Sequence, residues 1–162
     1  MPTYDAIATS TLSTAATSVT FSSISQSYTD LFLACKLKMA GGGATNTFMR
    51  FNGDTGTNYA NNGAYYTIGG SRGYYSNTAN NGIWLDNVDS TWTTVTQIDI
   101  NNYKSTNMKK TILVQSAAPA SQVDLKGGSW NSTAAINSIT IYNGSVNFAV
   151  GSQFTIYGIL AA

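Results

Sequence analysis

The stretch Gln153-Phe154-Thr155-Ile156-Tyr157-Gly158-Ile159-Leu160 indicates the fold class, because its side chains alternate in kind with a period of two. In an extended chain Phe154 and Ile156 point to one side, and Thr155 and Tyr157 point to the other. Such alternation is typical of a β-strand that is buried on one face only. Residues 153–160 therefore predict a strand.

The same alternation recurs along the chain and is separated by Gly-Gly and Asn-Gly pairs such as Asn52-Gly53, Asn62-Gly63 and Gly127-Gly128, which favour tight turns. Helix formers are scarce, since the chain contains no Glu and only two Arg. Further strands are predicted at Ser18–Ile24, Asp30–Met39, Thr47–Phe51, Thr94–Asn101, Met108–Ser116, Gln122–Lys126 and Asn137–Tyr142, with weaker candidates at Thr3–Ala8 and Gly82–Leu85.

These strands predict an all-β fold: an antiparallel two-sheet β-sandwich, jelly-roll-like, with eight to ten strands. We expect one domain over residues 1–162, with residues 1–17 as an N-terminal arm or edge strand. Gly53–Asn81 is the longest stretch without a clear pattern. The predicted core contains Leu31, Leu33, Cys35, Leu37, Phe51, Ile98, Ile100, Ile112, Val114, Ile139, Ile141, Phe154 and Ile156.

The composition argues against most enzyme classes. The 162 residues contain 22 Thr, 18 Ser and 16 Asn but neither His nor Glu. Without His, the usual serine and cysteine triads, His-ligated zinc and the commonest general base are excluded. We therefore predict a non-enzymatic protein without cofactor or metal. A polysaccharide-degrading enzyme that uses Asp residues is the weakest alternative.

The net charge of +1 does not favour a nucleic-acid partner, since the nearest thing to a basic stripe is Lys109-Lys110 beside Lys104. No signal peptide or membrane-spanning stretch is visible, so we expect no membrane partner. The single Cys35 shares a strand face with apolar residues and is predicted to be a core thiol.

Two acidic segments could be mistaken for cation sites. Asn52-Gly53-Asp54-Thr55-Gly56 lacks the further carboxylates of a calcium loop, which favours a tight turn. Asp86 and Asp89 could form a weak cation site, but residues of this type in a loop are more often turn formers or solvated charges.

Aromatic residues gather in and just after the stretch without a clear pattern. Aromatic rings beside amide side chains are typical of protein interfaces and of sugar-binding surfaces, and simple loop packing is a third reading. The candidate interface or glycan-contact residues are Tyr59, Tyr65, Tyr66, Tyr74, Tyr75 and Trp84.

Three blocks together resemble a β-rich module found in tailed bacteriophages of marine and freshwater bacteria. They are Ser27–Leu31, Met49–Tyr59, and a C-terminal block that runs from Trp130 to Phe148 and continues at Gly151–Ile159. The closing Phe-Thr-Ile-Tyr-Gly-Ile strand is the most specific piece. The blocks cover about a third of the chain.

The resemblance implies a structural virion protein without enzymatic activity, made in the host cytoplasm. The lack of a fibre shaft or coiled-coil heptads before Ser27 favours a capsid decoration or cement protein on the head surface. The alternative is a tail-fibre tip or receptor-binding module that holds host polysaccharide. The expected partners are further copies of the chain in a homotrimer, and the major capsid protein.

Overall fold

The computed structural model describes residues 3–119 and 121–160, which form twelve strands and no helix. The strands are β1 (Thr3–Thr11), β2 (Ser18–Phe21), β3 (Asp30–Leu37), β4 (Thr45–Phe51), β5 (Tyr59–Thr67), β6 (Arg72–Asn80), β7 (Ile83–Val88), β8 (Thr94–Asn101), β9 (Lys110–Ala117), β10 (Gln122–Trp130), β11 (Ile139–Asn143) and β12 (Gln153–Leu160).

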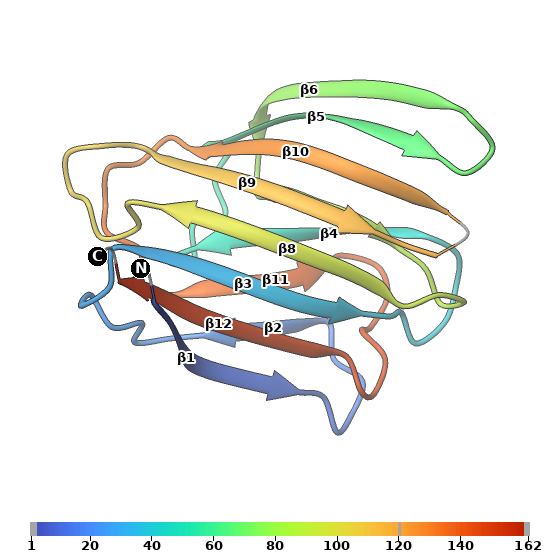
Figure 1. Ribbon diagram of the computed structural model, residues 1–162, viewed down its shortest axis with the longest axis horizontal. Coiled ribbons are helices and arrows are strands. Elements are labelled where there is room, and N and C mark those ends of the chain that lie inside the picture. The colour runs from blue at the N-terminus through green and yellow to red at the C-terminus, as the bar shows by residue number, and fades with distance from the viewer. Residues whose placement is uncertain (1–2, 120, 161–162) are drawn as a thin grey trace.

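The strands form two antiparallel sheets that pack face to face (Figure 1). The larger sheet has eight strands in the order β1-β12-β3-β8-β9-β10-β5-β6, and the smaller has four in the order β2-β11-β4-β7. When β5, β6, β9 and β10 are left aside, the other eight strands pair in the order of a jelly roll. This order is β1-β12-β3-β8 in one sheet and β2-β11-β4-β7 in the other. The predicted all-β sandwich is confirmed.

The core lies between the two sheets and is built from the inward positions of alternating strands. β9 shows this most clearly, because its residues are alternately buried and exposed from Lys110 to Ala117. All thirteen residues predicted for the core are buried. The core also includes aromatic side chains that alternation had not singled out, among them Tyr103, Trp130 and Phe148.

The strand count is higher than the predicted eight to ten, because Gly53–Asn81 contains a long hairpin. Strands β5 and β6 pair along this hairpin and extend the larger sheet beyond β10. β7, at the edge of the smaller sheet, still lies against β10 and β5. The hairpin reaches past this cover, so its residues do not show the regular burial that makes other strands recognisable.

Two of the predicted turns lie inside strands instead. Gly63 is in β5, where an added Cβ would lie 2.6 Å from the Tyr75 hydroxyl and 2.7 Å from the Leu125 carbonyl oxygen. Gly128 is in β10, where a Cβ would lie 2.8 Å from the Ile83 side chain. These glycines serve close packing rather than a turn.

The predicted turn at Asn52-Gly53 is present. Both residues have positive φ, 52° and 69°, and the Asp54 amide donates to the Phe51 carbonyl oxygen over 2.9 Å. This geometry matches a type I′ turn, which asparagine and glycine adopt at low cost. At the N-terminus, Thr3–Thr11 forms an edge strand of the larger sheet.

Candidate functional site

The structure divides the six aromatic candidates among three environments, because residues next to each other in a strand face opposite sides. Tyr66 and Tyr74 lie on the outer face of the larger sheet, which points away from the smaller sheet. Tyr65 and Tyr75 lie on the inner face, and Trp84 of β7 packs against Tyr75 with ring centroids 4.2 Å apart.

Tyr59 requires a correction, because its side chain is only 1% exposed and cannot contact a partner or a glycan. Its ring stacks on Trp130 and packs against Phe51, and its hydroxyl donates to the Asp54 carbonyl oxygen over 3.2 Å. Burial raises the pKa of Tyr59 to about 12. The residue joins the start of β5 to the core.

The inner aromatic pair of the hairpin is held by glycines on the opposite strand. Gly63 is directly opposite Tyr75, and Gly73 is directly opposite Tyr65. A Cβ on Gly73 would lie 2.6 Å from the Tyr65 ring, so each ring covers a glycine backbone. These contacts explain Tyr65 and Tyr75 as packing within the hairpin.

In its first half, strand β10 has its apolar side chains facing solvent and its charged side chains facing the interior, whereas Trp130 at its other end lies in the core. Val123 and Leu125 are 54% and 55% exposed, whereas Asp124 and Lys126 are buried. A strand with one face in the core normally has the opposite arrangement. The first half of β10 is therefore inverted, which produces an apolar outer surface and a buried ionic cluster.

The apolar outer surface forms a groove over β10, β5 and β6. Val123 is directly opposite Tyr66, and Leu125 is directly opposite Ala64, which is itself opposite Tyr74. Tyr74 is 90% exposed. The groove has a volume of about 810 Å³, and a neighbouring depression over β8 and β9 shares Val123 and Leu125 with it.

A second group of aromatic residues lies on the same outer face, toward β1. Tyr4, Phe32 and Tyr157 come from β1, β3 and β12, with ring centroids 5.8 Å apart for Tyr4–Phe32 and 6.0 Å for Phe32–Tyr157. Sequence reasoning missed this group. The signal was present in the alternation, since Phe32 and Tyr157 occupy the positions between the core residues of their strands.

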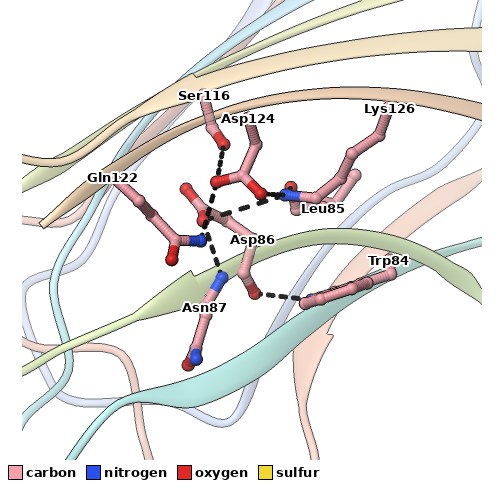
Figure 2. Close-up of polar contacts among 8 residues, drawn as sticks. All are labelled: Trp84, Leu85, Asp86, Asn87, Ser116, Gln122, Asp124 and Lys126. Carbon is pink, nitrogen blue, oxygen red and sulfur yellow. Dashed lines mark hydrogen bonds and ion pairs between the residues drawn. The ribbon is translucent and has the colours of Figure 1, made fainter. Parts of the chain in front are cut away.

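The interior cluster in Figure 2 joins β10 to β7. The Lys126 ammonium lies 3.1 Å from Asp124 Oδ1 and 3.9 Å from Asp86 Oδ1, and it donates to the Leu85 carbonyl oxygen over 2.8 Å. It also lies 4.9 Å from the centre of the Trp84 ring. The arrangement places one buried ammonium between two buried carboxyl groups and an aromatic ring.

Further hydrogen bonds hold the two carboxyl groups in place. Asp124 accepts from Gln122 Nε2 over 2.8 Å, and the Asn87 amide donates to Asp86 over 2.6 Å. Burial raises the pKa of Asp86, and the nearby Asp124 adds to this rise while Lys126 opposes it. Burial also lowers the pKa of Lys126, against the attraction of both carboxylates. Burial therefore favours the neutral forms of Asp86 and Lys126 more than water does.

The two other acidic positions singled out in the sequence have structural roles. Asp54 closes the loop after β4 by accepting hydrogen bonds from Trp130 Nε1 over 2.7 Å and from the Gly56 amide over 2.9 Å. Asp89 accepts from the Thr91 amide, whereas Asp86 points into the interior. Asp86 and Asp89 are thus held in different environments and do not form the weak cation site that was considered.

The thiol of Cys35 lies in the core, as predicted, and burial raises its pKa to about 12. Because the thiolate is the reactive form, we expect no measurable alkylation of native protein by iodoacetamide at pH 8. The same reagent should modify one thiol per chain in urea, which mass spectrometry would detect. Complete labelling of the folded protein within minutes would contradict this placement.

No family model, curated protein or solved structure matches this chain. Within residues 3–119 and 121–160, no helix has the length and apolar character needed to cross a membrane.

Proposed function

We propose that the protein is a non-enzymatic structural protein of a bacteriophage particle, a capsid decoration or cement protein that docks through the outer face of its larger sheet. The observation that carries this proposal is the inversion of β10. Val123 and Leu125 lie near the start of β10, the sixth of the eight strands, and are more than half exposed. Large apolar side chains gathered on one exposed face are typical of a surface that a partner covers.

The size of the face supports docking. Eight strands at a spacing of about 4.8 Å, each about 27 Å long, give an area of roughly 900 Å². A standard interface buries about 800 Å² on each partner, so this one face is large enough for specific attachment.

The chemistry of the face also suits a neutral protein partner. Its outward positions carry few charges, chiefly Lys36, Arg72, Asp30 and Asp99, and are otherwise mostly Thr, Ala, Gln, Asn and aromatic residues. Burial, together with the nearby Asp30, raises the pKa of Asp99. Three sequence blocks resemble a phage module, and this resemblance is the reason for proposing that the protein belongs to a virion. We expect the protein to assemble as a homotrimer.

Cryo-electron microscopy of the parent phage would test the location, with density for the sandwich expected on the capsid. In a matched binding assay, particles that lack the protein would be mixed with purified chain. The double variant Val123→Asp, Leu125→Asp should lose at least tenfold in occupancy, because two carboxylates would be buried without partners. The control, Thr20→Asp with Asn46→Asp, changes exposed positions of the smaller sheet and should bind as the original does.

Density confined to the tail, or equal occupancy for both double variants, would overturn the docking proposal. Either result would favour a second candidate function, the retention of host polysaccharide in the groove. The observation that favours it is the pairing of Tyr66 and Tyr74 with the exposed Arg72 along one groove. Tyr74→Ala would then abolish retention on host polysaccharide and leave capsid occupancy unchanged, because a stacking face for sugar is lost.

A further inference from the structure

Lys126 is a primary amine that the fold buries beside two carboxyl groups. Its nitrogen lies 3.1 Å from Asp124 Oδ1 and 3.9 Å from Asp86 Oδ1 (Figure 2). All three side chains are at most 2% exposed. Because two groups that are about to react lie about 3–3.5 Å apart, the amine and the carboxyl groups are already close to the separation that a covalent reaction needs.

The protonation states in the cluster suit a condensation between an amine and an acid. Burial lowers the pKa of Lys126 and raises the pKa of Asp86. Transfer of one proton from the Lys126 ammonium to the Asp86 carboxylate gives a free amine and a carboxylic acid, and it leaves the net charge of the cluster unchanged. The free amine is the nucleophilic form of lysine, and a carboxylic acid accepts a nucleophile more readily than a carboxylate does.

The hydrogen bonds of Asp86 distinguish its two oxygens. The Asn87 amide donates to Oδ1 over 2.6 Å, and a donor in this position stabilises the negative charge that develops on that oxygen when the carboxyl carbon is attacked. Oδ2 is buried and has no hydrogen-bond partner within residues 3–119 and 121–160. Oδ1 is therefore suited to become the amide oxygen, and Oδ2 is suited to leave.

Asp124 is placed to act as the base. Its Oδ2 accepts hydrogen bonds from Gln122 Nε2 over 2.8 Å and from Ser116 Oγ over 3.4 Å, which matches a carboxylate that acts only as an acceptor. Its Oδ1 faces the Lys126 nitrogen and, apart from this ion pair, has no partner among the described residues. Oδ1 can therefore take a proton from the nitrogen as the nitrogen reacts.

Aromatic rings separate the three groups from solvent. The Trp84 ring lies 4.9 Å from the Lys126 nitrogen, and Tyr75 packs against Trp84 with ring centroids 4.2 Å apart. Exclusion of water strengthens the polar interactions inside a site and protects its products from hydrolysis. An amide formed in this position would therefore persist.

We propose that Lys126 and Asp86 condense to an amide that covalently joins β10 of the larger sheet to β7 of the smaller sheet. The Lys126 nitrogen attacks the Asp86 carboxyl carbon, and a C–N bond forms. Asp124 takes a proton from the nitrogen and passes it to Asp86 Oδ2, the C–O bond breaks, and one water molecule leaves. The amine and the acid supply every atom of the amide and of the water. The ion pair is the state before this reaction.

Mass spectrometry of the denatured full chain tests for the bond. We expect a mass one water molecule below that calculated for the sequence, and no such deficit for Lys126→Arg, whose guanidinium does not condense with a carboxyl group. The full calculated mass for the original chain would overturn the proposal.

A tryptic digest locates the bond. Trypsin does not cleave after an acylated lysine, so residues 73–104 should be recovered joined to residues 111–162 through Lys126. Lys110 is the internal control, since its buried ammonium donates to carbonyl oxygens and cleavage after it should be complete. A loss of water that maps to any other pair of residues, including Lys126 with Asp124, would also overturn the proposal.

A pair of variants tests the role of Asp124. Asp124→Asn should lower the cross-linked fraction at least about tenfold, because a neutral amide does not take up the proton. Asp5→Asn removes a carboxylate from an exposed position of β1 and should cross-link as the original does. Equal cross-linked fractions for the two variants would contradict the assignment of Asp124 as the base. Docking does not enter these measurements, so their outcome is independent of the proposed function.

Discussion

Replacing Lys126 with methionine is expected to lower the free energy of unfolding by about 3–5 kcal/mol at neutral pH. The side chain is buried, and its ammonium is the counter-charge of Asp124 and Asp86. Without it, two carboxyl groups would remain in the interior with no opposite charge. Urea unfolding followed by tryptophan fluorescence would measure the loss.

The loss should depend on pH. An aspartate whose folded pKa is above its unfolded value binds a proton more readily in the folded state, so stability falls as pH rises from about 3.9 through the folded pKa. Asp86 already shows this direction, and removing Lys126 removes the attraction that opposes it. The deficit of Lys126→Met should therefore shrink toward pH 4, and adding Asp86→Asn and Asp124→Asn should recover part of it at neutral pH.

Lys110 provides the matched control. It is also fully buried, but its ammonium donates to the carbonyl oxygens of Ser105, Met108 and Thr133 instead of pairing with a carboxylate. Lys110→Met should lower stability without a comparable dependence on pH between about 4 and 8, because no buried carboxylate is left behind. A pH-independent deficit for Lys126→Met would show that the cluster is not electrostatically coupled.

Phe154→Ala should cost about 3–5 kcal/mol, because a large apolar side chain is replaced by a cavity. The ring is fully buried in β12 and meets Phe148 edge-to-face, with centroids 5.3 Å apart. Thermal unfolding followed by circular dichroism would measure the change. Tyr74→Ala is the control, since the exposed ring of Tyr74 should contribute little to stability, and a loss below about 1 kcal/mol for Phe154→Ala would place that residue outside the core.

The strands that alternation predicted have one face in the core between the two sheets. Thr94–Asn101 and Gln153–Leu160 have the predicted bounds, because burial on one face imposes the period of two. β5 and β6 escaped prediction for the opposite reason. They extend past the smaller sheet, so Asn, Gly and Tyr are tolerated on both of their faces.

The ionic cluster could not be predicted from the sequence. Asp86 and Lys126 are distant along the chain, and charged residues in an alternating strand are expected to face solvent. Lys110 shows the same difficulty: it stood in a short basic run with Lys109, yet it is buried. The decisive information is the position of β7 against β10, which depends on the whole topology.

The inversion of β10 has a consequence for folding. Shifting this strand by one residue against β9 would turn Val123 and Leu125 inward and release Asp124 and Lys126 to water. This gain in hydrophobic burial is offset at the other end of the strand, where Trp130 would leave the core. The native alignment therefore competes with a slipped alternative during folding. Partners that only the native alignment offers, Leu85 and Asp86 across from Lys126, distinguish the two. We expect variants that weaken the cluster to refold more slowly and to populate misaligned species. In these variants the contacts of Lys126 no longer stabilise the native alignment over the slipped one.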